Sequence, residues 1–276
     1  MKTRLRIRSI AGSRLFLALA VLASLAFVIG ILILLRRGPS KAGSQEALTI
    51  RDMLAGKDIL LGWTPGLEEL AELGCSITVE PTYVHCVQPD RSIPIIVRFP
   101  TVRALNFVRQ TLGHEVRELP KLPELERLSF ISCEFDADLA FFSDLHSLRY
   151  LGIRDSNLTN AHLQQVLSDL HFLTQLDLGN SNVSSLDFLD GMTELEVLRL
   201  DATRITDDDL QSIPTLEKLR VLEVGWTDIT DASVDVLLEI KGLQELNIWG
   251  TWVTEDGVRR LESSISRVSH DYLRSQ

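Results

Sequence analysis

The chain has 276 residues with a hydrophobic share of 45%, which allows one large or two small folded domains. Its net charge of -10 is unevenly distributed: residues 1–41 carry eight basic and no acidic side chains, so the other 235 residues have 28 - 8 = 20 basic and 38 acidic groups, a net of -18. This acidic part argues against a nucleic-acid partner, because Lys and Arg supply most of the affinity for phosphate.

The first predicted element is a membrane-spanning helix over residues 15–35, which are all apolar or small. About 20 such residues cross a bilayer as a helix. Five basic residues precede the run, in a basic tail over residues 1–14, and three follow it, which favours a cytoplasmic N-terminus and places the rest outside the cytoplasm. We therefore predict a single-pass signal anchor. A cleaved signal peptide is the alternative, because Ser40, Lys41 and Ala42 resemble a cleavage site.

Residues 36–58 are predicted to form a stalk, and residues 59–101 an N-terminal cap. In the cap we expect a helix over residues 64–73 and strands over residues 76–80, 83–87 and 93–99, which are rich in Ile, Val and Tyr. Cys75 and Cys86 allow one disulfide bridge, and His85 beside Cys86 allows a zinc site. A set of four regularly spaced ligands is lacking, so we predict no metal and no cofactor.

Residues 102–264 repeat one phrase seven times, Leu-x-x-Leu-x-Leu followed by a small polar residue and another aliphatic residue. The phrases start 22 to 25 residues apart, at Val102, Leu125, Leu148, Leu173, Leu195, Leu219 and Leu243. A repeat of this length indicates stacked units. Positions 1, 4, 6 and 11 are apolar, and the two-residue period of a strand turns positions 4 and 6 to the same, inward face. Position 9 is mostly Ser or Thr, whose hydroxyl can bond turning backbone.

A second signal follows each of the last five phrases, where a hydroxyl residue predicts the start of a helix. These residues are Thr159, Ser184, Thr206, Thr230 and Thr254, and the last three precede Asp207, Asp231 and Glu255. A hydroxyl oxygen accepts from free amides at a helix start, and an acid there complements the helix dipole. The periodic recurrence of these Thr-acid pairs favours capping over catalysis or metal binding. Residues 265–276 are predicted to be a C-terminal cap or tail.

The phrase resembles the leucine-rich repeat family from Val102 to about Ser264. Units with Ile-Thr-Asp before the helix are similar to repeats of bacterial, planctomycete-like membrane-anchored proteins and of eukaryotic F-box adaptors. The resemblance implies an α/β fold, a right-handed curved solenoid with a concave parallel sheet and short convex helices, and protein recognition by the concave face. The chain departs from the family at position 9, where Ser or Thr replaces Asn, and in the degenerate first unit.

The candidate site lies where the repeat leaves residues free. Side chains at positions 3, 5 and 7 alternate out of the sheet and need not be apolar. Asp177, Arg199 and Glu223 are expected to form a charge ladder, since neighbouring strands lie about 4.8 Å apart. Trp226, Trp249 and Trp252 come from adjacent units, and exposed tryptophans are enriched at binding hot spots. The alternative for these three residues is that they pack on the C-terminal cap, against Val268 and Tyr272. The predicted partner-binding residues are Tyr150, Arg154, Asp177, Arg199, Asp201, Glu223, Trp226, Trp249 and Trp252.

No catalytic constellation is evident, because the six His residues fall in unrelated registers and the sequence contains no H-E-x-x-H, no G-x-S-x-G and no Gly-rich loop with phosphate-binding spacing. The sequence therefore predicts a non-enzymatic, membrane-anchored interaction module of receptor, adhesion or scaffold type, with a protein partner and no small-molecule substrate. Two alternatives stay open: an intracellular F-box-like adaptor, and an envelope hydrolase that uses Cys75, His85 and Cys86.

Overall fold

The structure is a computed structural model that describes residues 69–70, 72–79, 82–86, 88–136 and 138–270. The predicted tail, membrane span and stalk lie outside these residues, as does most of the predicted helix over 64–73, of which residues 69, 70 and 72 are helical. Within the described ranges, no helix is long and apolar enough to cross a membrane.

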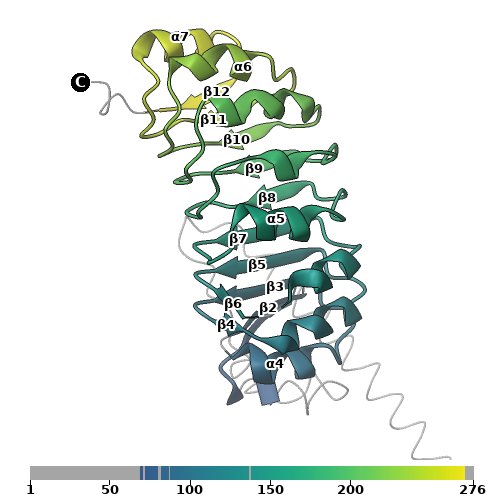
Figure 1. Ribbon diagram of the computed structural model, residues 1–276. Coiled ribbons are helices and arrows are strands. Elements are labelled where there is room, and N and C mark those ends of the chain that lie inside the picture. The colour runs from purple at the N-terminus through teal and green to yellow at the C-terminus, as the bar shows by residue number, and fades with distance from the viewer. Residues whose placement is uncertain (1–68, 71, 80–81, 87, 137, 271–276) are drawn as a thin grey trace, which may run out of the picture.

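One sheet of ten strands runs through the described part of the chain (Figure 1). The first two strands form an antiparallel hairpin, and every later strand pairs in parallel with its predecessor in the stack. The strands are β1 (Ser76–Val79), β2 (Thr82–Cys86), β3 (Ala104–Val108), β5 (Arg127–Ile131), β7 (Tyr150–Arg154), β8 (Gln175–Asp177), β9 (Val197–Arg199), β10 (Val221–Glu223), β11 (Glu245–Asn247) and β12 (Arg267–Ser269). A second, short sheet pairs β4 (Thr111–Leu112) with β6 (Glu134–Phe135).

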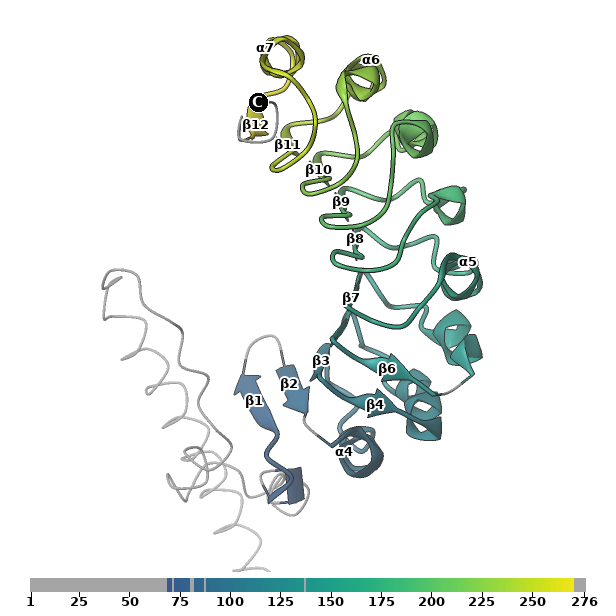
Figure 2. The same ribbon diagram turned by 60° about the vertical axis from the view of Figure 1, so that its left-hand side comes forward.

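The stack is curved, with the ten strands on its inner side and the helices on its outer side (Figure 2). The helical segments are α4 (Pro89–Ile96), η1 (His114–Lys121), η2 (Leu139–Asp144), α5 (Asn160–Leu167), η3 (Asp187–Leu189), η4 (Asp208–Thr215), η5 (Asp231–Ser233), α6 (Val234–Leu238) and α7 (Glu255–Glu262). Two of them, η3 and η5, are single 3₁₀ turns of three residues, which suits the short outer arm of a unit of this length. The predicted α/β leucine-rich repeat solenoid is confirmed for the described residues.

The register of the sheet aligns the repeated phrases. Position 4 of each unit lies beside position 4 of the next, for example Leu198 beside Leu222 and Leu222 beside Leu246. All side chains at positions 1, 4 and 6 are buried in one continuous core, as are those at position 11 except the partly buried Phe135. The inward face predicted from the two-residue period is confirmed.

The predicted role of position 9 is confirmed in four units, where the hydroxyl donates to the carbonyl oxygen of the residue three positions earlier. The donors are Ser181, Thr203, Thr227 and Thr251, at 2.5 to 2.8 Å. Each bond satisfies a backbone acceptor where the chain leaves the sheet.

Three of the five predicted helix starts are confirmed: the hydroxyls of Thr159, Thr230 and Thr254 accept from backbone amides at the beginning of a helix. The helix start predicted at Ser184 is wrong, because η3 begins at Asp187 and the Asp187 amide donates to Ser185 Oγ. The capping role predicted for Thr206 is also wrong, because the Thr206 hydroxyl donates to Asp209 Oδ2 instead of accepting from a helix amide.

Two of the acids beside these threonines also link neighbouring units. The carboxylate of Asp207 accepts from the amide and hydroxyl of Thr230, both at 2.8 Å, and from the Ser233 hydroxyl. Asp231 accepts in the same way from the amide and hydroxyl of Thr254, at 2.8 and 2.7 Å. Each acid thus ties the start of one outer arm to the start of the next.

Within the cap, the strands predicted at residues 76–80 and 83–87 are confirmed as β1 and β2, but the strand predicted at residues 93–99 is wrong. Residues 89–96 form α4, which buries Ile93, Ile95 and Ile96. Pro89 stands at the start of this helix, where the missing amide hydrogen costs no bond. The β-branched run was compatible with either structure, and packing against the core decided for the helix.

The last strand, β12, continues the repeat beyond the seventh phrase. Val268 lies beside Leu246 in register, so Val268 takes position 4 and the buried Ile265 position 1 of a truncated eighth unit. The predicted C-terminal cap is therefore, at its beginning, a further strand of the same sheet.

Candidate concave binding surface

The concave face carries a row of polar contacts across neighbouring strands. One of these contacts joins Tyr150, at position 3, to Arg127: the guanidinium carbon of Arg127 lies 4.2 Å from the centroid of the Tyr150 ring. Its hydroxyl covers Gly152, where an added Cβ would be only 2.7 Å from the oxygen. Burial raises the pKa of Tyr150, and the charge of Asp177 adds to the effect. The phenol is therefore held as a neutral hydrogen-bonding group.

Arg154 and Asp177 form the next contact, between position 7 of one unit and position 5 of the next. The Nη1 atom of Arg154 lies 2.8 and 3.0 Å from the two carboxylate oxygens of Asp177, which also accepts from the Gly179 amide. Asp177 is only 6% exposed, and an ion buried to that degree needs a partner of opposite charge. This pair is structural as well as part of the surface.

The predicted charge ladder is confirmed only in part. Arg199 Nε and Glu223 Oε1 form the expected ion pair at 2.9 Å. Asp177 is the backbone neighbour of Arg199 in the register, but its ion pair is diagonal, with Arg154. The prediction that Asp177 pairs with Arg199 is therefore wrong, because the long Arg154 side chain reaches the carboxylate across the strand gap.

Asp201 and Glu223 bring two carboxyl groups together at the C-terminal end of the face. Burial, together with the charge and the hydrogen bond of Glu223, raises the pKa of Asp201 to about 6. The Oδ1 atom of Asp201 accepts from the Gly225 amide at 3.1 Å and from Asn247 Nδ2 at 3.4 Å. Arg199 pairs with Glu223, and Arg154, whose charge also acts on Asp201, pairs with Asp177. Two arginines thus face three acids, so this end of the surface is negative.

The three predicted tryptophans are large exposed side chains in the last two repeats, near Asp201 and Glu223. Trp226, Trp249 and Trp252 are 52%, 44% and 48% exposed. Trp249 stands at position 7, beside Gly225 and two strands from Asp201. The backbone of Trp252 forms an isolated parallel β-bridge with Thr230 of the preceding unit. Val268, one of the two residues of the alternative explanation, packs against the core, whereas Tyr272 lies outside the described residues.

Trp226 has a backbone conformation that its side chain disfavours. Position 8 of every unit is left-handed: the residues there are Arg109, Ser132, Asp155, Asn180, Ala202, Trp226 and Gly250, with φ between 50° and 66°. Bulky residues rarely adopt this region. The ring of Trp226 lies on the backbone of Gly250, where an added Cβ would be 2.5 Å from ring atom Cε3. The tryptophan is thus held across the edge of the next unit.

Seven of the nine predicted residues stand at positions 3, 5 and 7 of the concave side: Tyr150, Arg154, Asp177, Arg199, Asp201, Glu223 and Trp249. Trp226 and Trp252 stand beside it, at positions 8 and 10 of the segment that leaves the sheet. Sequence reasoning missed the contributions of Arg127, Asn247, Gly225 and Gly250. Glycines at positions 5, 7 and 8 were the available signal, because a strand residue without a side chain marks a close approach.

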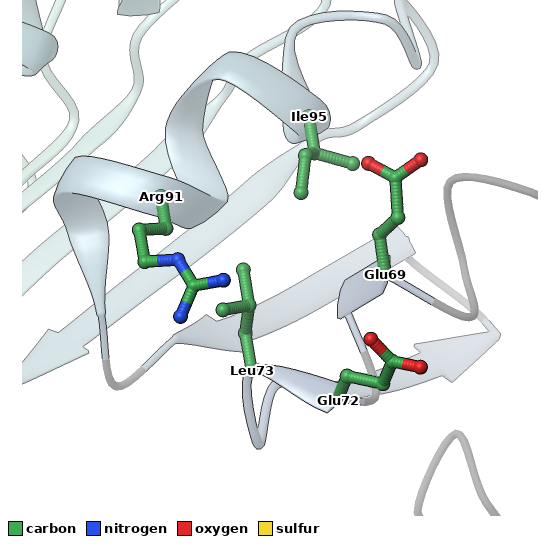
Figure 3. A pocket seen from close by; sticks show the side chains of 5 residues that line it. All are labelled: Glu69, Glu72, Leu73, Arg91 and Ile95. Carbon is green, nitrogen blue, oxygen red and sulfur yellow. The ribbon is translucent and has the colours of Figure 1, made fainter.

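Among the described residues, two of the hollows lie away from this face. One, of about 250 Å³, lies in the N-terminal cap between α4 and residues 69–73, and Glu69, Glu72, Leu73, Arg91 and Ile95 line it (Figure 3). The other, of about 320 Å³, includes Arg103, Glu124 and His146 and lies at the edge where the strands begin. Neither contains a nucleophile paired with a base.

The cluster proposed for a hydrolase is only partly described. Cys75 is buried next to β1, His85 Nδ1 lies 3.2 Å from Asn106 Nδ2, and the side chain of Cys86 lies outside the described residues. No group of three or more His, Cys, Asp and Glu is placed to hold a metal ion in the described ranges. The disulfide bridge stays a prediction.

No family model matches the sequence, and no curated protein matches it. Among solved structures, an internalin (inlF) from Listeria monocytogenes is 19% identical with a TM-score of 0.48, over 64% of this chain and 56% of its own length. An internalin C2 from the same organism is 17% identical with a TM-score of 0.46, over 58% of this chain and 76% of its own. The chain thus spans little more than half of the first of these. The leucine-rich repeat fold stated above rests on register and burial.

Proposed function

We propose that this protein is a non-enzymatic, membrane-anchored interaction module that binds a protein partner on the concave face of its solenoid. The observation that carries the proposal is the exposure of Trp249 at one end of that face and of Trp226 and Trp252 beside it. The core takes its apolar side chains from the repeat positions, and these three residues stand outside those positions. Large exposed aromatic groups mark interaction sites, and Trp is enriched among residues that dominate binding energy.

The polar row beside the tryptophans supports the same function. Tyr150, Arg154, Arg199 and Glu223 are held in fixed positions by contacts across strands. A partner therefore meets side chains that lose little conformational freedom on binding, which lowers the entropic cost of association. A rigid face with a polar row and an aromatic end has the composition of an interface.

The anchoring part of the proposal rests on the sequence. The apolar run over residues 15–35, with five basic residues before it and three after it, supports a cytoplasmic N-terminus and an extracytoplasmic solenoid. A reporter fused after Gln276 tests this: an enzyme active only outside the cytoplasm supports the orientation, and one active only inside contradicts it.

The binding part is tested by co-purification from native membranes. We expect that the Trp226→Ala, Trp249→Ala, Trp252→Ala triple variant loses partners that the wild type retains. Phe172→Ala is the matched control, because Phe172 is the other large exposed hydrophobic residue in the described part, at 57%, and lies outside the tryptophan cluster. Unchanged recovery of every partner by the triple variant would contradict the proposal.

A further inference from the structure

The C-terminal end of the concave face combines one exposed aromatic ring with two carboxyl groups. Asp201, Gly225 and Trp249 occupy position 7 of three successive units, and the strand-to-strand spacing of about 4.8 Å separates the outer two by roughly 10 Å. Gly225 carries no side chain, and the carboxylate of Asp201 leans over it, 3.0 Å from where a Cβ would stand. The Trp249 carbonyl oxygen and Asn247 Oδ1 lie 3.1 and 3.4 Å from the same point, so the Asp201 carboxylate and the strand that carries Trp249 form one continuous surface across Gly225.

The charges at this point are unbalanced toward the negative. Asp201 faces Glu223 on the neighbouring strand, and the cations on this face are Arg199, paired with Glu223 at 2.9 Å, and Arg154, paired with Asp177 at 2.8 Å. Neither arginine is paired with Asp201. Two acids held together in a half-buried position repel each other, and a cation from outside relieves that repulsion.

The neighbouring backbone indicates that the aromatic edge is retained despite a local cost. Trp226 sits at a left-handed position where the other six units place Arg, Ser, Asp, Asn, Ala or Gly. A non-glycine residue there costs on the order of 1–2 kcal/mol. The ring of Trp226 covers Gly250 directly after Trp249, so the two tryptophans continue one aromatic edge beside the carboxylates.

We propose that Trp249, Asp201 and Glu223 form a receptor for a lysine or arginine side chain in a basic segment of the protein partner. The cationic group bonds the two carboxylates, and its aliphatic stem lies against the exposed Trp249 ring. An aromatic face and a carboxylate both attract a cation. This inference rests on the proposed function, because it specifies the chemistry of a partner that binds the same face.

Charge complementarity selects this occupant over others. The chain after residue 41 has a net charge of -18, which repels nucleic acids and anionic lipid surfaces and attracts basic protein segments. A neutral apolar segment fits the tryptophans but leaves the excess negative charge of Asp201 and Glu223 uncompensated. A basic segment satisfies both parts of the surface.

The test uses the full chain labelled with 5-fluorotryptophan and observed by fluorine NMR. The chain has four Trp, and the Trp249 signal is assigned by its loss in Trp249→Phe. Hexalysine is the probe and hexaglutamate the control peptide. We expect a saturable shift of the Trp249 signal with hexalysine and none with hexaglutamate.

The decisive comparison is between two double variants that remove equal charge. Asp201→Asn with Glu223→Gln removes the proposed receptor, and Asp208→Asn with Glu217→Gln removes one exposed Asp and one exposed Glu elsewhere. We expect the first pair to weaken hexalysine binding at Trp249 about tenfold, and the second pair by less than about twofold. Equal weakening by both pairs, or no shift of the Trp249 signal, would overturn the inference.

These outcomes are separate from those that test the proposed function. If the triple tryptophan variant loses its membrane partner while the Asp201, Glu223 double variant keeps it, the face binds a protein and the cation receptor is wrong. If neither variant loses a partner, the proposed function itself is contradicted.

Discussion

Adding one methyl group at Gly250 tests the position of the Trp226 ring. The Cβ of Gly250→Ala would stand 2.5 and 2.6 Å from ring atoms Cε3 and Cδ2 of Trp226, and the backbone φ of 66° disfavours any side chain. The left-handed conformation costs on the order of 1 kcal/mol for Ala. Displacing a packed ring adds about 1 to 3 kcal/mol, as other overpacked sites do. We expect a loss of about 2 to 4 kcal/mol in the free energy of unfolding.

A double-mutant cycle separates these two contributions. In a Trp226→Ala background the ring is absent, so Gly250→Ala should cost only the backbone term of about 1 kcal/mol. Ala202→Gly is the control, because Ala202 occupies position 8 two units earlier with φ 52° and its change to Gly should stabilise by a similar amount. Urea unfolding of the full chain in mild detergent, followed by circular dichroism, measures each value. Equal costs of Gly250→Ala with and without Trp226 would refute the ring placement.

Three further substitutions probe the repeat contacts and the acid pair. Asp231→Ala removes the acceptor of both Thr254 bonds and should lower the unfolding free energy by about 1 to 3 kcal/mol; a change below about 0.5 kcal/mol in urea titration would show that the link is dispensable. Arg154→Ala leaves the buried Asp177 without its counter-ion and should cost about 1 to 3 kcal/mol at pH 7, whereas an unchanged midpoint would contradict the assigned pair. Asp201 has a folded pKa of about 6 against an ordinary 3.8, so the folded state holds its proton more tightly and stability falls as pH rises from about 4 to about 6. Asp201→Asn should therefore be more stable than wild type by about 1 kcal/mol at pH 7.5, with the advantage gone near pH 4; a pH-independent difference would rule out titration of this carboxyl as the cause.

Most of the fold could be predicted because the spacing of apolar residues in the repeat predicts which side chains face the core. Leu222 and Val224 share a face by the two-residue period of a strand, and both are buried as expected. Thr254 precedes an acidic turn and caps α7. The cap was harder, because Ile93, Ile95 and Ile96 fit a strand as well as a short helix, and only packing against the core selects between them.

The site could be predicted in its members but not in its contacts. Neighbouring strand positions identify pairs such as Arg199 and Glu223, which form as expected. The diagonal pair of Arg154 with Asp177 depends on the length and direction of the side chains. Aligning the repeat positions in the sequence does not predict these directions. The left-handed backbone at Trp226 was hidden in the same way, because position 8 carries seven different residue types and only Asp155, Asn180 and Gly250 favour that conformation.

The central claim is that the tryptophan end of the concave face contacts a protein partner. Its most direct test places a photo-crosslinking amino acid at position 249 of the full chain in native membranes, with position 172 as the control for exposure alone. The account predicts a discrete crosslinked species from position 249 that is absent from position 172 and is competed by hexalysine. Crosslinking that is equal at the two positions, or absent at position 249, would contradict it.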